Sequence, residues 1–280
     1  IRAALGTGKS LSFVRPHEQQ TGAIMRVLFC IVVALGLLTQ ARSETVEIPT
    51  RPGVSQKLLV LNTPDPKATL ILFPGGHGGL QLYPNGSMKW GDNNFLVRTR
   101  QNFANQGYSV IVVDAPSDRQ SPPFLQGFRQ RPEHAADIKA VIAWARQSAK
   151  VPVWLIGTSR GTQSVGYLVT ELTGAEGPDG AVLTSSILAD DKGRPVPAMP
   201  LGKVRIPILV VHHEKDGCVH CPFLGAQQVI DKLSNSPRKQ LIAITGGNTS
   251  GDECAALAYH GFNGTEQSVV QQIVDWIAIK

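Results

Sequence analysis

Short apolar runs alternate with amphipathic segments from about residue 46 to the end of the chain. The runs are four to six residues long and are bounded by Gly, Pro, Asn or Asp, as is typical of β-strands. The first two are expected to form an antiparallel pair, and the pattern predicts about eight strands in a mostly parallel sheet. The expected strands are residues 46–49, 58–61, 68–73, 109–114, 151–156, 180–185, 207–212 and 240–245.

Helical periodicity fills most of the gaps between these runs. Ile138, Val141, Ile142 and Ala145 recur at spacings of three and four, which places them on one face of a helix. Strands that alternate with helices predict an α/β fold in which helices cover both faces of the sheet. The expected helices are residues 94–104, 132–149, 160–172, 223–233 and 265–279.

Two polar loops, residues 77–93 and 116–131, follow the carboxyl ends of expected strands. Ligands of open α/β sheets bind at that edge. Tyr83, Trp90 and Phe124 are therefore candidate walls of a substrate pocket. The alternative is that the apolar residues of these loops only pin the loops to the body of the protein.

The segment that begins at Met25 has the features of a secretory signal. Arg26 is followed by 12 apolar residues, 27–38, and by a small-residue cleavage site that ends at Ala41. A membrane anchor, the alternative, needs about 20 apolar residues. We interpret residues 1–24 as an upstream leader outside the native protein, 25–41 as a signal peptide and 42–280 as one α/β domain, secreted or periplasmic, with no stable membrane anchor after cleavage.

The charge balance argues against a nucleic-acid partner. The chain has 27 Lys and Arg against 21 Asp and Glu, a net charge of +6. Residues 1–41 contain four of the basic residues and one of the acidic ones, so 23 minus 20 leaves +3 for the remainder. A nucleic-acid-binding domain is expected to be far more basic. The sequence leaves the oligomeric state open.

Cys218, Cys221 and Cys254 remain once the signal is removed, which predicts one disulfide and one spare thiol in an oxidising compartment. A bridge from Cys218 or Cys221 to Cys254 and a bridge within the Cys-x-x-Cys both stay open. A zinc site that uses His220 is disfavoured because four well-spaced ligands are missing. We expect no metal.

The run 151–156 leads directly into Gly157-Thr158-Ser159-Arg160-Gly161 and then into an expected helix. This strand, sharp turn and helix are typical of a nucleophile elbow, which presents a serine hydroxyl on a tight turn. Glycines at its ends give room where a side chain would collide. Ser159 is therefore the candidate nucleophile.

Two further segments accompany this motif: Phe73-Pro74-Gly75-Gly76-His77-Gly78-Gly79 after the third strand and the run 102–108 before the fourth. With these segments, essentially the whole of residues 42–280 resembles the α/β-hydrolase superfamily. Small esterases and dienelactone-hydrolase-like members are the most similar subgroups. The resemblance implies the chain order Ser, acid, His. Asp216 follows the strand 207–212 and is the expected acid, with Asp190 as the alternative. His260, before the last helix, is the expected base.

The resemblance also implies backbone donors for the oxyanion of an acyl-transfer intermediate. Those expected are the N–H of Arg160 and the N–H of Gly76 or His77. The glycine cluster 75–79 could instead hold a phosphate, but no Lys-Ser/Thr follows it. The Arg160 side chain is expected to form a salt bridge or to bind a substrate carboxylate.

The expected activity is hydrolysis of a small-molecule or polymeric carboxylic ester through a Ser159–His260–Asp216 triad, with no cofactor. Only about 20 residues, 187–206, separate the sixth and seventh strands, so no large cap domain is expected and the cleft should be open. Alternatives are a serine peptidase or amidase on the same triad, a polyester hydrolase, and a non-catalytic ligand-binding relative.

Overall fold

The structure, a computed structural model, describes residues 42–190 and 193–279 together with Gly8 and Ser10. The interpretation of residues 1–41 as a leader and a signal peptide therefore falls almost wholly outside the described residues.

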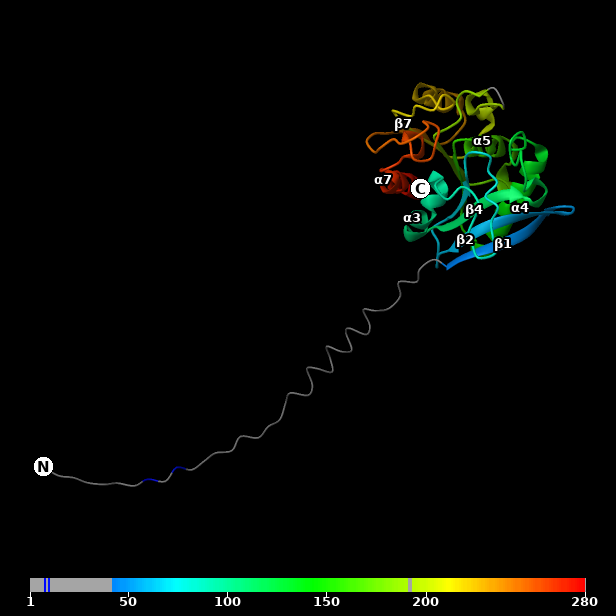
Figure 1. Cartoon of the computed structure of the whole chain (residues 1–280). Helices are drawn as coiled ribbons and strands as arrows, with labels where there is room; N and C mark the ends of the chain where they lie inside the picture. Colours follow the sequence, from blue (N-terminus) through cyan, green and yellow to red (C-terminus); the bar gives the residue numbers. More distant parts are fainter. Residues whose placement is uncertain (1–7, 9, 11–41, 191–192, 280) are drawn as a thin grey trace. The chain divides into compact units, whose positions relative to one another are not determined.

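Eight strands form one sheet in the described part of the chain, in the order β1-β2-β4-β3-β5-β6-β7-β8. Strand β2 pairs antiparallel with β1 and β4, and every other neighbouring pair is parallel. Figure 1 shows β1 and β2 together at one edge. The predicted strands and the opening antiparallel pair are confirmed. The strands are β1 (Arg42–Arg51), β2 (Val54–Asn62), β3 (Thr69–Phe73), β4 (Ser109–Pro116), β5 (Val153–Thr158), β6 (Gly180–Thr184), β7 (Ile208–His213) and β8 (Lys239–Ile244).

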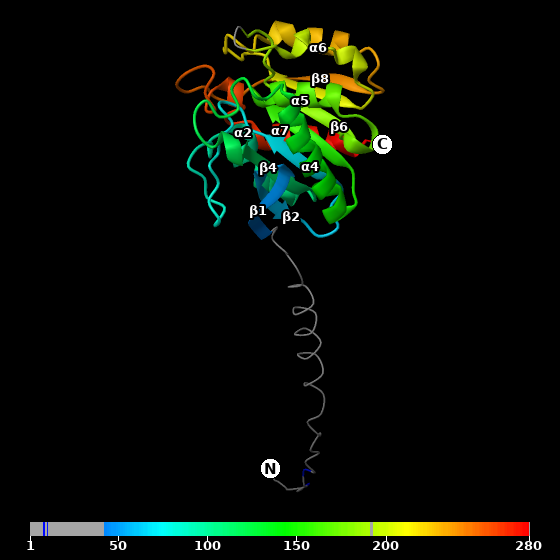
Figure 2. The same cartoon turned by 90° about the vertical axis from the view of Figure 1, so that its right-hand side faces the viewer.

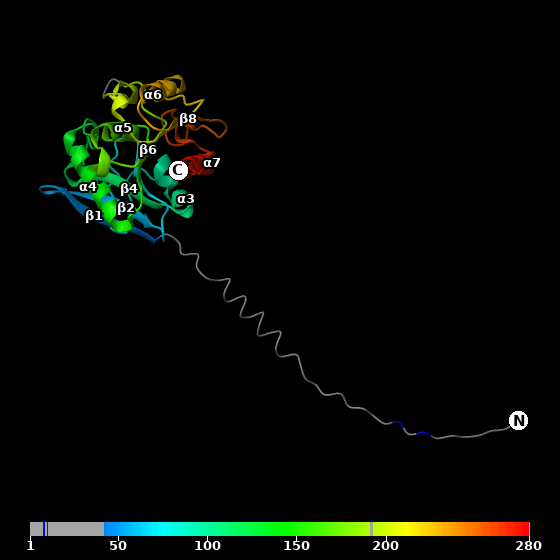
Figure 3. The same cartoon turned by 180° about the vertical axis from the view of Figure 1, so that it is seen from behind.

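Helices cover both faces of the sheet. Helices α4, α5 and α6 bury their apolar sides in one core, and α2, α3 and α7 bury theirs in the other. Figure 2 shows α4 and α5 in front of the strands with α7 behind them, and Figure 3 shows α3 beside α7. The helices are α2 (Phe95–Arg98), α3 (Arg100–Asn105), α4 (Pro132–Ala149), α5 (Gly161–Glu171), α6 (Ala226–Lys232) and α7 (Glu266–Ala278).

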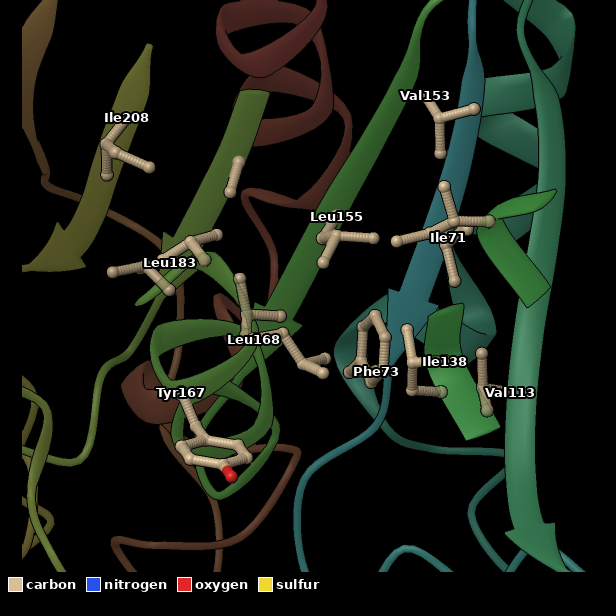
Figure 4. Close-up of a cluster of buried hydrophobic side chains, with 14 of the residues drawn as sticks. Ile71, Phe73, Val113, Ile138, Val153, Leu155, Tyr167, Leu168, Leu183 and Ile208 are labelled. Atoms are coloured by element: carbon tan, nitrogen blue, oxygen red, sulfur yellow. The ribbon is translucent and has the colours of Figure 1, made fainter. Parts of the chain in front are cut away.

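The two cores follow from the alternation of side chains along each buried strand. In β3, Ile71 and Phe73 point to the α4–α5 side, while Leu70 and Leu72 point to the α7 side. The same alternation in β5 sends Leu155 to the first core. Figure 4 shows this first core, in which strand side chains meet Ile138 of α4 and Leu168 of α5.

The helix predicted for residues 94–104 is divided at Thr99, where α2 ends and α3 begins. The Thr99 hydroxyl donates to the carbonyl oxygen of Phe95 at 2.7 Å. Threonine side chains that bond the preceding turn bend or interrupt a helix. The helix predicted for residues 223–233 likewise begins as a 3₁₀ turn, η5 (Phe223–Gly225), before α6.

No large cap covers the sheet edge in the described residues, as predicted. Between β6 and β7 the described residues, 185–190 and 193–207, contain only two 3₁₀ turns, η3 (Val196–Ala198) and η4 (Leu201–Lys203). None of the helices in the described residues combines the length and hydrophobicity needed to span a lipid bilayer.

A disulfide joins Cys218, in the loop after β7, to Cys254, in the loop after β8. Of the pairings left open by the sequence, the bridge to Cys254 through Cys218 is confirmed, and the bridge within the Cys-x-x-Cys is wrong. Cys221 is a free, buried cysteine. Burial raises the pKa of its thiol, so it carries little thiolate with which to attack the disulfide.

We expect a non-reduced digest to contain one cross-linked pair of peptides, which carry Cys218 and Cys254, while Cys221 alkylates only after unfolding. Because the bridge closes a loop with a sequence separation of 36 residues, the Cys218→Ser/Cys254→Ser variant should lose about 3–4 kcal/mol of unfolding free energy in a urea titration. Cys221→Ala, which keeps the bridge, is the matched control. A Cys218–Cys221 peptide would contradict the pairing.

Candidate active site

The turn between β5 and α5 holds Ser159 in the left-handed region, with φ +51°. The Ser159 N–H donates to the carbonyl oxygen of Thr184 at 3.0 Å, and its own carbonyl accepts from the N–H of Thr162 at 2.9 Å. A non-glycine residue in this region is strained and persists only where its surroundings fix it. The strand therefore stops at Thr158 and reverses sharply at the serine.

The glycines that flank this turn are required by close backbone contacts. A Cβ atom at Gly157 would lie 2.6 Å from the carbonyl oxygen of Gly161. A Cβ atom at Gly161 would lie 2.0 Å from the carbonyl oxygen of Phe73, at the end of β3. Neither distance admits a side chain, so the elbow packs directly against the neighbouring strand.

Asp216 and His260 are brought together from two loops. Asp216 lies after β7, and His260 lies in the 3₁₀ turn η6 (Tyr259–Gly261) before α7. Nδ1 of His260 is 2.9 Å from Oδ2 of Asp216, and both side chains are buried. An ionised carboxylate only accepts, so with Asp216 in that form Nδ1 of His260 is the donor of this hydrogen bond.

Each member of this pair accepts one further hydrogen bond. Oδ1 of Asp216 accepts from the N–H of Cys218 at 3.0 Å. The carbonyl oxygen of His260 accepts from the Ser185 hydroxyl at 2.7 Å. The disulfide partner of Cys218 lies six residues before His260, so the covalent bridge also links the two loops.

Ser159 and His260 line the same cavity, which has a volume of about 520 Å³. Nε2 of His260 is buried and has no hydrogen-bond partner among the described residues. No hydrogen bond therefore joins His260 to the Ser159 hydroxyl in this structure, although both residues line the cavity. Other residues that line this cavity include Gly75, Gly76, Trp90 and Ala256.

The glycine-rich turn after β3 packs against the serine, since a Cβ atom at Gly75 would lie 2.9 Å from the Cβ atom of Ser159. Gly76 adopts φ +56°, and Arg129 holds the turn by donating to the carbonyl oxygens of Pro74 at 3.0 Å and Gly76 at 3.3 Å. In the described part of the chain, neither the N–H of Gly76 nor that of Arg160 donates a hydrogen bond to another backbone carbonyl. Both groups remain available as donors, the second at the start of α5.

The His77 ring packs between aromatic side chains and does not serve as the base. It lies 4.0 Å from the Trp90 ring and stacks 4.4 Å from the Phe124 ring, measured between centroids. Its Nδ1 accepts from the N–H of Gly79 at 3.1 Å. Burial, followed by the charge of Arg129, lowers the pKa of His77, so the ring is neutral.

The three residues expected to line the pocket have different positions. Trp90 lines the cavity, and its ring occupies the space that a side chain at Gly76 would need. Phe124 stacks on His77 and is not among the residues that line the cavity. Tyr83 is 50 % exposed and also lies outside the lining. Of the two readings of the loops, pinning describes most of their apolar residues, because Leu80, Leu82, Met88, Leu125 and Phe128 are buried.

Asp190, the alternative acid, lies elsewhere. Its buried carboxylate accepts from Nη1 of Arg160 at 2.7 Å and from the amide of Gln163 at 2.9 Å. The Arg160 side chain thus makes the salt bridge, one of the two roles expected for it. His212 is 3.9 Å from Asp216, but burial lowers its pKa to about 4.

A metal site fits these residues poorly. Ligand atoms of Cys218, Cys221 and His260 lie within 4.8 Å of one another. However, Cys218 is committed to the disulfide, and the Cys221 thiol holds its proton because burial raises its pKa. His220 is half-buried, with Nδ1 3.2 Å from the carbonyl oxygen of Ala189. A structural zinc site needs four thiolate or imidazole ligands.

Two residues that shape the site were missed by the sequence reasoning. Buried Asp114 accepts from the N–H groups of Leu80, Gln81 and Leu82 at 2.7, 3.1 and 3.0 Å and so holds the loop that carries Trp90. Arg129 fixes the glycine turn. An aspartate at the end of an apolar strand was a usable signal for Asp114, whereas nothing in the local pattern singles out Arg129.

Comparisons with known proteins give structural likeness alone. No family model matches the chain, and neither does any curated protein. The esterase Pf2001 of Pyrococcus furiosus is 12 % identical with a TM-score of 0.62, over 96 % of this chain and 98 % of that one. A dienelactone hydrolase of Anabaena variabilis is 14 % identical with a TM-score of 0.58, over 85 % and 97 %.

XC6422 of Xanthomonas campestris, described as an α/β serine hydrolase without a lid, is 17 % identical with a TM-score of 0.51, over 85 % of this chain and 96 % of that one. Identities this low establish an arrangement of strands and helices and not an activity. The sheet order and these likenesses together identify the α/β-hydrolase fold, as the sequence motifs predicted.

Proposed function

We propose that the protein is a serine hydrolase that cleaves carboxylic esters. The observation that carries the proposal is the buried Asp216–His260 hydrogen bond beside Ser159: His260 and the strained Ser159 turn line one cavity, and Nε2 of His260 has no hydrogen-bond partner among the described residues. These are a nucleophile, a base and an orienting carboxylate in one site.

In the proposed reaction, Ser159 attacks the ester carbonyl while Nε2 of His260 takes the hydroxyl proton. Asp216 keeps the proton of His260 on Nδ1 and stabilises the imidazolium that forms. The imidazolium then protonates the departing alcohol, which leaves an acyl group on Ser159. Water attacks the acyl-enzyme with the same base, and the acid product departs.

The N–H groups of Gly76 and Arg160 are the proposed donors to the carbonyl oxygen as it becomes negative. Both are free of backbone partners in the described residues, and the second belongs to the residue that follows the nucleophile. Preorganised donors of this kind contribute several kcal/mol to the transition state because they need no reorganisation during the reaction.

The open site favours short-acyl or extended ester substrates, polyesters included. A cavity of about 520 Å³ with no covering domain in the described residues gives little enclosure for a long acyl chain. A peptidase or amidase would use the same three residues, and a ligand-binding relative would retain the cavity without turnover. The structurally similar proteins that are described as esterases favour ester hydrolysis over these alternatives.

We further propose that the protein works outside the cytoplasm. The Cys218–Cys254 disulfide supports this location because such bonds persist mainly in oxidising compartments.

The first test is turnover of p-nitrophenyl butyrate by Ser159→Ala. Without the nucleophile, kcat should fall more than about 1000-fold. Ser148→Ala, on the exposed side of α4, is the matched control and should keep wild-type kcat. Equal turnover by Ser159→Ala and wild type would refute the assignment, and cleavage of peptide but not ester substrates by the wild type would favour the peptidase.

The second test separates the two candidate acids. Asp216→Asn should lower kcat by about 1000-fold or more, since the amide no longer holds the productive tautomer of His260. Asp190→Asn should lower kcat far less, because Asp190 contacts Arg160 and not the imidazole. Circular dichroism of each variant checks folding. Equal losses in the two variants would contradict the role given to Asp216.

A further inference from the structure

A second cavity, of about 280 Å³, adjoins the one that contains Ser159. Gly76 lines both, so the two cavities meet at the glycine turn. The second cavity is strongly basic, because its lining includes four arginines. These are Arg129, Arg131, Arg160 and Arg194, and we call this cavity the arginine cleft.

The positive charge of the arginine cleft is only partly balanced. Arg160 is paired with Asp190 at 2.7 Å. Over residues 42–190 and 193–279, no salt bridge joins Arg129, Arg131 or Arg194 to a carboxylate. Three arginines that line one small space therefore have no carboxylate partner in the described chain; Arg129 is buried, whereas Arg131 and Arg194 are exposed.

Arg129 is the most unusual of these groups. Its side chain is 5 % exposed, yet its hydrogen bonds go only to neutral acceptors, the carbonyl oxygens of Pro74 and Gly76 and the hydroxyl of Ser164. A buried charge is costly unless an opposite charge compensates it. The Ser164 bond, at 3.0 Å, ties the guanidinium to α5, the helix that follows the nucleophile.

The pKa values of neighbouring titratable groups are lowered by the same positive charge. Burial lowers the pKa of Arg129 to about 9, with a further contribution from the charge of Arg160. The charge of Arg129 in turn contributes to the lowered pKa values of His77 and His134, for which burial is the larger cause. A bound anion would relieve this repulsion between arginines.

We propose that the arginine cleft binds an oxyanion, a carboxylate or a phosphate, beside the nucleophile. Arg160 directly follows Ser159, and Gly76 belongs to both cavities, so an anion in the cleft lies a short chain away from the scissile carbonyl. Guanidinium groups suit this ligand because their planar donors pair with two oxygens at once. The anion can be part of the substrate, and this form of the proposal rests on the proposed function. In that case the preferred ester carries a carboxylate or phosphate on its acyl chain.

The binding test does not depend on turnover. Ser159→Ala protein is titrated calorimetrically with glutarate and, separately, with inorganic phosphate. We expect saturable binding of one or both, weakened about 10-fold when Arg131→Gln and Arg194→Gln are added, since charged hydrogen bonds are lost. Arg205→Gln, an exposed arginine outside the cleft that donates to the carbonyl oxygen of Gly202, is the matched control. Absence of saturable binding of both anions would overturn the proposal.

The turnover test asks where the anion comes from. The wild type and the Arg131→Gln/Arg194→Gln variant are compared on mono-p-nitrophenyl glutarate and on neutral p-nitrophenyl hexanoate, and the ratio of their kcat/KM values should fall about 10-fold in the variant. An unchanged ratio with intact anion binding assigns the cleft to a free anion and supports the site. Failure to hydrolyse either ester would reject the esterase, while the titration still decides the cleft.

Discussion

The direct packing of α5 against the end of β3 is the constraint on which the site depends. The carbonyl oxygen of Phe73 lies where a side chain at Gly161 would begin, 2.0 Å from its Cβ position. Strand β5 ends at Thr158 and α5 begins at Gly161, so only Ser159 and Arg160 make the turn, and Ser159 takes the strained φ of +51°. Such strain costs about 1–3 kcal/mol. The buried strands β3 and β5, apolar on both faces, hold the two backbones together and offset that cost.

The sheet and most helices could be predicted because elements that are buried produce a regular pattern of apolar residues in the sequence. Residues of β3 and β5 alternate between two cores, so each is a continuous apolar run, and α4 shows its buried stripe at spacings of three and four. The division between α2 and α3 at Thr99 could not be predicted from this pattern. It depends on one hydroxyl that bonds the Phe95 carbonyl, a local competition that periodicity does not report.

The positions of the candidate site residues could be predicted where they depend on order along the chain, and not where they depend on the direction of a side chain. A serine on a glycine-flanked turn, an aspartate after β7 and a histidine before α7 follow from position along the sheet edge. The loop residues Phe124 and Tyr83 follow no such rule, and the structure directs one onto His77 and the other toward solvent. Asp114 and Arg129 act across 32 to 55 residues of chain, beyond any local pattern.

Arg129 connects the two halves of the site through the rigidity of the peptide group. By holding the carbonyl oxygens of Pro74 and Gly76, its guanidinium fixes the planes of the peptides that follow each residue. The peptide that carries the Gly76 N–H lies between these two fixed planes. Its direction is therefore set from the arginine cleft. The same positive charge lies behind the turn at which negative charge would develop in the proposed ester cleavage, and burial makes the field of that charge stronger than it would be in water. One side chain thus orients a donor and biases the electrostatic potential around it.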